Sequence, residues 1–189
     1  RTTGLAIDIW KPSANGAVNA IAISGNDIYV AGEFTTIGGQ SRKSIAKLNN
    51  TFGEANTNWN PDPSGIVNTI AISGSFLYVG GQFISIGGQS RSNLAKLSLT
   101  NGQANINWNP FADYEVFTIA ITGNEIFVGG RFTSINYPIN HLAKLNITNG
   151  QVDTTWKPEP DHYVFTIGIS GSDIYIGGSF QVIGRQQRN

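Results

Sequence analysis

The chain has 189 residues, of which 40% are hydrophobic and 13% charged, about half of the usual charged share of roughly 25%. Hydrophobic residues are plentiful and the net charge is zero, so the composition excludes a disordered chain. Twelve basic residues balance twelve acidic ones, so the chain offers no basic surface for nucleic acid. The absence of cysteine excludes disulfides and thiolate metal sites, and no apolar stretch approaches the roughly 20 residues of a transmembrane helix.

A repeat with a period near 48 residues runs through the whole chain. A segment that reads V-N-A-I-A-I-S-G ends at Gly25, and related segments end 49, 98 and 146 residues later. Tryptophans followed two residues later by proline recur at the same intervals, at Trp10, Trp59, Trp108 and Trp156. Such periods are typical of solenoids, propellers and arrays. The units span residues 13–61, 62–110, 111–158 and 159–189, the last one incomplete, and residues 1–12 are the tail of a preceding unit.

Each unit is predicted to contain four short strands, which the first unit illustrates. Val18–Ser24 places isoleucines on one face and small alanines on the other. Asp27–Phe34 is almost continuously apolar, so both of its faces must be covered. The third strand contains Ile45–Leu48, and the fourth leads to the Trp-x-Pro sequence. Because such units repeat in tandem without helical periodicity, we predict an all-β fold: a β-propeller with four tandem four-stranded blades.

The repeat resembles a known bacterial family at these residues. The string V-x-x-I-A-I-S-G-x-x-I-Y-V-G-G-x-F-x-x-I-G-G-x-x-R-x-x-I-A-K-L, followed by W-x-P, looks like the delta-sixty-type repeat, a β-propeller domain of unknown function. This resemblance implies a large secreted or surface-attached bacterial protein and carries over no catalytic residues. The third unit departs from the pattern at residues 136–140, which predicts a special loop there.

The last unit is predicted to have an open edge. Val164–Ser170 pairs with Asp173–Phe180, and the outer edge of the second strand lacks a partner. One interpretation is that the chain is a segment of a larger propeller. The alternative is a closed four-bladed ring, in which Leu5–Trp10 completes the last blade. A segment would associate through its open edge or fold poorly, and a sequence like Asn93–Leu97 added after Asn189 would improve it.

The residues common to the units favour structural roles. The tryptophans are predicted as wedges between blades, with sugar stacking as the alternative. The recurring cations are expected to bond carbonyl groups or a carboxylate within the blade; they are Lys47, Lys96, Lys144, Arg42, Arg91 and Arg188. His141 and His162 have no carboxylate at metal-ligand spacing, so we expect no metal site and no cofactor.

The residues that vary between the units indicate a candidate binding site. The segment before each first strand has no aromatic residue in residues 13–16 and 62–65, but becomes acidic and aromatic in residues 111–115 and 159–163. In a propeller this connection lies on the face around the central channel. The candidate ligand-binding residues are Asp113, Tyr114, Glu115, Asp161, His162 and Tyr163. Ordinary loop drift is the alternative, and a pair of catalytic carboxylates is a further one.

These observations predict a non-catalytic binding or scaffolding module at the cell surface. Its expected partner is a glycan or a protein, which binds the loop face of the third and fourth units. The first alternative is a purely structural component of a large extracellular assembly. The second alternative is a polysaccharide hydrolase or lyase with carboxylates at the channel rim. No nucleic-acid partner and no membrane insertion are expected.

Overall fold

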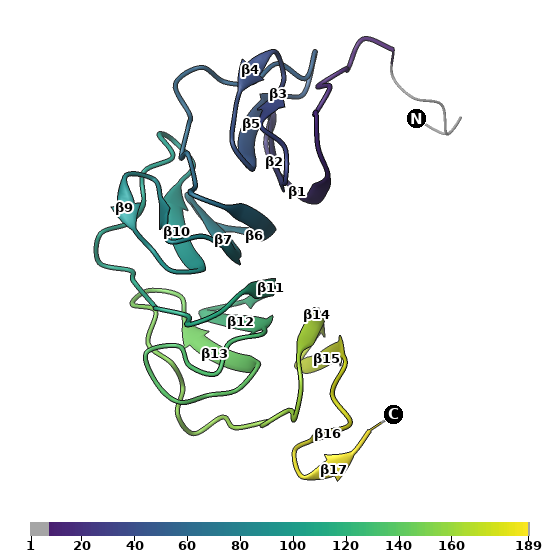
Figure 1. Cartoon of the computed structure of the whole chain (residues 1–189), viewed down its shortest axis with the longest axis vertical. Helices are drawn as coiled ribbons and strands as arrows, with labels where there is room; N and C mark the ends of the chain where they lie inside the picture. The colour runs from purple at the N-terminus through teal and green to yellow at the C-terminus, as the bar shows by residue number, and fades with distance from the viewer. Residues whose placement is uncertain (1–7, 189) are drawn as a thin grey trace.

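The computed structural model describes residues 8–188, and these residues form an all-β chain without helices. Four antiparallel sheets follow one another along an arc (Figure 1). We call these sheets, with their outer loops, blades 1 to 4. None of the described residues belongs to a helix that is long and apolar enough to cross a membrane.

Each of the first three blades contains its own three-stranded sheet, and the middle strand of that sheet is the second in sequence. Blade 1 consists of β1 (Val18–Ser24), β2 (Asp27–Gly32) and β5 (Ile45–Asn49). Blade 2 consists of β6 (Ile66–Ser73), β7 (Phe76–Gln82) and β10 (Leu94–Ser98). Blade 3 consists of β11 (Val116–Thr122), β12 (Glu125–Gly130) and β13 (Leu142–Asn146). Blade 4 contains only β14 (Val164–Ser170) and β15 (Asp173–Gly178).

Small hairpins, which the sequence did not predict, project from the outer side of three blades. They pair β3 (Thr36–Ile37) with β4 (Gln40–Ser41), β8 (Ser85–Ile86) with β9 (Gln89–Ser90), and β16 (Val182–Ile183) with β17 (Gln186–Gln187). In blade 3 the special loop replaces the hairpin by two isolated bridges, Ala112 to Ile135 and Ser134 to Pro138.

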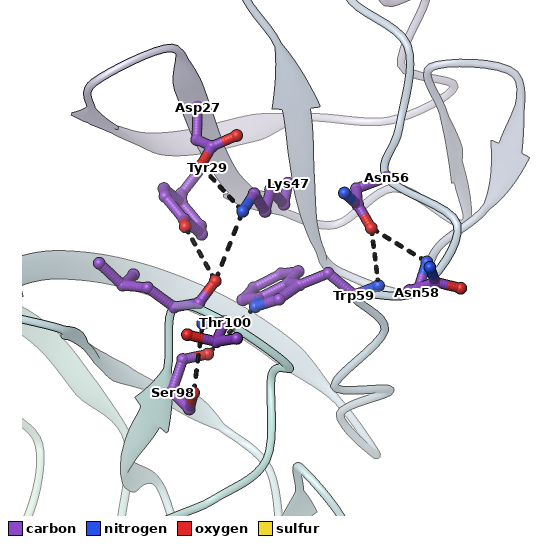
Figure 2. Close-up of polar contacts among 9 residues, drawn as sticks. Asp27, Tyr29, Lys47, Asn56, Asn58, Trp59, Ser98 and Thr100 are labelled. Carbon is purple, nitrogen blue, oxygen red and sulfur yellow. Dashed lines mark hydrogen bonds and ion pairs between the residues drawn. The ribbon is translucent and has the colours of Figure 1, made fainter.

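The prediction of four-stranded blades was wrong in its fourth strand. In blades 1 to 3 that strand is reduced to one β-bridge each: Leu48 to Ala55, Leu97 to Ala104 and Leu145 to Val152. The residue after the bridge turns the chain away from the sheet. In blade 1 the side-chain oxygen of Asn56 accepts hydrogen bonds from the backbone amides of Asn58, at 3.0 Å, and Trp59, at 3.1 Å. This turn directs Trp59 into the space before the next blade (Figure 2).

Successive blades pack face to face around these tryptophans. Trp59 and Trp108 are completely buried, which confirms the prediction of their burial. Each tryptophan meets an aromatic ring of the preceding blade edge-on: Tyr29 lies 5.3 Å from Trp59, Tyr78 lies 5.4 Å from Trp108, and Phe127 lies 5.3 Å from Trp156. The core of the protein therefore lies between blades rather than inside one sheet.

The first strand of each blade, which is β1, β6, β11 or β14, lies on the concave side of the arc (Figure 1). Figure 1 shows no closure of the arc between blade 4 and blade 1. The predicted use of residues 5–10 as a strand of the last blade falls partly outside the described residues. The indole N–H of Trp10 donates to the carbonyl of Asn49, at 3.2 Å, so this residue lies against blade 1.

The predicted structural cations bond backbone carbonyls and carboxylates. Arg42 donates to the carbonyls of Ser41 and Asn56, both at 2.7 Å, and Arg91 does the same in blade 2. Lys96 donates to the carbonyl of Ile147 at 3.2 Å, which ties blade 2 to blade 3. Burial lowers the pKa of Lys96 because it disfavours the charged ammonium.

Candidate functional site

The connection into each first strand is fastened by one polar side chain. Asn15, Ser64, Asp113 and Asp161 occupy equivalent positions in the four blades. Each side-chain oxygen accepts hydrogen bonds from two consecutive backbone amides of the outer loop, 20 and 21 residues later. The fastening is therefore common to all units, although the residue type differs.

The two candidate aspartates have this anchoring role in blades 3 and 4. Asp113 accepts from the amides of Thr133 and Ser134, at 2.9 and 3.0 Å, and from the Thr133 hydroxyl, at 2.6 Å. Asp161 accepts from the amides of Gln181 and Val182, at 2.8 and 3.0 Å. These hydrogen bonds lower the pKa of both carboxyl groups, against the opposing effect of desolvation. The carboxylates are thus ionised and engaged, an arrangement that suits loop anchoring better than proton donation.

The other four candidates gather where blades 3 and 4 meet, and with Arg131 and His141 they form what we call the rim patch. The Arg131 guanidinium lies 5.6 Å from the Tyr114 ring and 5.7 Å from the Tyr163 ring. It also lies 3.8 Å from the Glu115 carboxylate. Arg131 thus connects the loop of blade 3 to the loop of blade 4. Tyr114 and Arg131 are exposed, so a ligand could reach both.

Two histidines extend the rim patch. The His162 ring lies 4.0 Å from the Tyr163 ring, and the His141 ring lies 5.2 Å from Tyr163 and 6.2 Å from His162. The Nδ1 atom of His141 is buried and has no hydrogen-bond partner among the described residues. Burial, and secondarily the nearby His162, lower the pKa of His141, so its imidazole is neutral at pH 7.

Arg131 and His141 are the rim-patch residues that the sequence interpretation missed. Arg131 stands where the other units have Glu33, Gln82 and Ser179, and His141 stands where blades 1 and 2 have Ser44 and Asn93. Both positions vary between units, as do those of the loop candidates. A column-by-column comparison of the units would have identified them.

The special loop of blade 3 lies beside a separate hollow. This hollow has a volume of about 400 Å³ and is lined by Asn107, Asn109, Tyr137, Asn149, Gln151 and Thr154, among others. Asn136 holds the loop in place: its side-chain oxygen accepts from the Phe111 amide, and its side-chain nitrogen donates to the Asn109 carbonyl, both at 3.3 Å. The predicted departure at residues 136–140 thus forms part of the wall of a hollow outside the rim patch.

Within residues 8–188, no group of three or more histidine, aspartate or glutamate side chains could hold a metal ion. The rim patch offers aromatic faces, one guanidinium, one carboxylate and imidazole nitrogens. Aromatic rings bind apolar surfaces, and the polar groups would bond hydroxyl or amide groups.

The tandem antiparallel sheets, packed face to face along an arc, define a protein of the β-propeller type. A family described as a β-propeller domain of unknown function (DUF5122) matches residues 26–51 and 77–104, within blades 1 and 2. This match supports a β-propeller repeat family. No curated protein matches the chain.

Two solved structures support the same fold. The computationally designed Ika4 protein superposes with a TM-score of 0.64 at 12% identity, over 93% of this chain and 94% of that one. The WD40 β-propeller domain of Doa1 superposes with a TM-score of 0.60 at 14% identity, over 87% of this chain and 49% of that one. At these identities the likeness concerns the fold alone.

Proposed function

We propose that this chain is a non-catalytic binding module of a secreted or cell-surface bacterial protein, and that it binds a glycan through the rim patch. The cell-surface placement is supported by the low charge and by the resemblance to a bacterial surface repeat. A protein ligand at the same patch is the alternative form of the proposal.

One observation carries the proposal: the large side chains that distinguish the loops before β11 and β14 from those of blades 1 and 2 meet at one place. Blades 1 and 2 have Gly16 and Gly65 where blade 3 has Tyr114 and blade 4 has His162. A Cβ at Gly65 would lie 2.1 Å from the carbonyl oxygen of Gln82, so that loop has no room for a side chain. The loops of blades 3 and 4 carry large side chains at this position, and structural repetition does not require them.

The composition of the rim patch favours a carbohydrate. A sugar ring presents an apolar face of C–H groups, which stacks on tyrosine, and hydroxyl groups, which bond to arginine, glutamate and histidine. The rim patch offers two tyrosines with Arg131 between them. A ligand that bridges both tyrosines would contact blades 3 and 4 together.

A glycan array followed by titration calorimetry tests the proposal. Tyr114→Gly restores the residue of blades 1 and 2, and Tyr163→Ala restores Ala17 of blade 1. We expect each change to weaken binding of the captured glycan at least tenfold, which is about 1.4 kcal/mol. Tyr137→Ala, which alters a partly exposed tyrosine outside the patch, is the matched control and should leave the affinity unchanged.

Two results would contradict this assignment. Loss of binding in Tyr137→Ala but not in Tyr114→Gly would move the site to the hollow beside the special loop. A lack of binding across the array would refute the glycan form of the proposal.

A further inference from the structure

The two ends of the arc expose faces that are buried between the internal blades. We call the face of blade 1 that points away from blade 2, and the face of blade 4 that points away from blade 3, their outer faces. On the outer face of blade 1, Ile21 and Ile23 are 58% and 68% exposed. Ile70 occupies the position of Ile21 in blade 2, and it is 8% exposed because blade 1 covers it. On the outer face of blade 4, Tyr175 is 61% exposed, whereas its equivalent Tyr78 is 1% exposed.

The aromatic pairs show which surface fits each end. Tyr29, Tyr78 and Phe127 each meet the tryptophan that precedes the next blade. Among the described residues, this series leaves one aromatic residue and one tryptophan unmatched: Tyr175 at one end and Trp10 at the other. The end of blade 4 thus lacks the kind of group that the start of blade 1 presents.

Trp10 is already held as the internal Trp59 is. Its indole N–H donates to the carbonyl of Asn49, the last residue of β5, at 3.2 Å. In the same way Trp59 donates to the carbonyl of Ser98, the last residue of β10, at 3.1 Å. Trp10 also packs against the buried residues of blade 1. The outer face of blade 1 is therefore organised like the face that blade 2 presents to blade 1, of which Figure 2 shows Trp59 and Ser98.

A surface that covers Tyr175 must also provide a hydrogen-bond acceptor for its hydroxyl group. In the internal interfaces, the Tyr29 hydroxyl donates to the carbonyl of Leu99 at 3.2 Å, and the Tyr78 hydroxyl donates to that of Ile147 at 3.3 Å. Both acceptors directly follow the third strand of the next blade. Asn50 follows β5 in the same way. Blade 1 thus offers Tyr175 an aromatic partner, Trp10, and a carbonyl acceptor at Asn50.

We propose that the outer face of blade 4 binds the outer face of blade 1 in a second copy of this chain, head to tail. Within one chain these faces do not meet, because the arc is open between them (Figure 1). The faces differ from each other and each repeats one side of an internal interface, so the contact is heterologous. Two copies that satisfy both faces at once form a closed dimer.

Sedimentation of the 189-residue chain over a range of concentrations tests the proposal. We expect the unmodified chain to be a dimer, and Ile21→Asp and Tyr175→Asp each to be monomeric, because a charge would be buried without a partner. Both side chains are exposed in the single chain, so each variant should keep the circular dichroism spectrum of the unmodified protein. Ile84→Asp alters an isoleucine that is 73% exposed in an outer loop and should remain dimeric.

A mixing experiment identifies the head-to-tail arrangement. Ile21→Asp keeps its blade 4 face and Tyr175→Asp keeps its blade 1 face, so an equimolar mixture should form a one-to-one heterodimer. Tyr175→Phe, which lacks only the hydroxyl, should weaken dimerisation about five- to tenfold for each of the two hydrogen bonds that the closed dimer loses, or about 25- to 100-fold in all. A monomeric unmodified chain would overturn the proposal, since another occupant would then cover these faces. A dimer that only one of the two aspartate variants abolishes would also overturn it, because the contact would join like faces.

Discussion

Each fully buried tryptophan joins two blades at the scale of single residues. Trp59 meets the Tyr29 ring of blade 1 and bonds the carbonyl of Ser98 in blade 2. Since large aromatic side chains provide most of the area buried in such interfaces, the loss of one ring should weaken two blades at once.

Trp108→Ala should lower the free energy of unfolding by about 3–5 kcal/mol, as large-to-small changes in a packed core do. Urea unfolding followed by circular dichroism measures this loss. Ile106→Ala serves as the control, because Ile106 is exposed two residues away and its loss should stay within about 0.5 kcal/mol. A loss below about 1 kcal/mol for Trp108→Ala, with weakened sugar binding, would favour the stacking role of the tryptophans.

His141 gives the protein a pH-dependent stability. Its pKa is lowered in the folded state, so the unfolded chain binds the proton first as the pH falls below the ordinary imidazole value of about 6.5. The free energy of unfolding should therefore decrease between pH 7.5 and 5.5, by at most about 1.4 kcal/mol per pH unit from this one proton.

His141→Asn tests this expectation because blade 2 has Asn93 at the same position. The variant should lose that part of the slope in urea unfolding measured between pH 7.5 and 5.5. An unchanged slope would assign the pH dependence to another group. Asp113 and Asp161 affect the stability at a lower pH than His141 does. Their pKa values are lowered in the folded state, so the stability that they contribute is lost only as the pH falls through the ordinary carboxyl range and below.

At the scale of elements, one hydrogen-bond acceptor side chain fixes the position of the loop that leads into each first strand. The acceptor is asparagine in blade 1, serine in blade 2 and aspartate in blades 3 and 4. Because the bonded groups are backbone amides of the outer loop, the fastening sets the position of the rim loop relative to the blade.

Asp113→Ala should destabilise the protein by about 1–3 kcal/mol, since the amides of Thr133 and Ser134 lose their acceptor. Asp113→Asn should cost much less, because Asn15 performs the same role in blade 1. Thermal melting of both variants measures the difference. Equal losses in the two variants would show that the carboxylate charge, and not the hydrogen bonds, matters.

At the scale of the whole molecule, each blade packs mainly against its neighbours in sequence. Stability in such a chain is close to a sum of unit and interface contributions, so the end blades should open more easily than the internal ones. Because the arc is open (Figure 1), blades 1 and 4 each have one face that no neighbouring blade covers.

Hydrogen exchange of a monomeric variant should reveal this gradient. In Ile21→Asp, the amides of β15 should exchange faster than those of β7, because β15 lacks the third strand and the neighbouring blade that cover β7. Mass spectrometry of peptides from the two strands provides the measurement. Equal protection of β7 and β15 would contradict independent opening of the end blade.

The sequence by itself determined the repeat, the existence of the first three strands in the first three units and the burial of the central tryptophans, although the second strand ends at Gly32 rather than at Phe34. Those features depend on local alternation, turn residues and a period that every unit shares, and the strand Val18–Ser24 was predicted with its observed bounds. The structural roles of Arg42 and Arg91 followed from the same repetition.

Only the tertiary structure decided which residues meet across blades. The fourth strand became a single bridge because the side chain of Asn56 turns the chain towards the next interface. Arg131 and His141 joined the rim patch because blades 3 and 4 place distant segments side by side. The unmatched residues Tyr175 and Trp10, at opposite ends of the arc, became visible only when the other aromatic pairs had been located. Spacing along the chain fixes what one unit looks like, whereas contacts between units depend on how the blades pack.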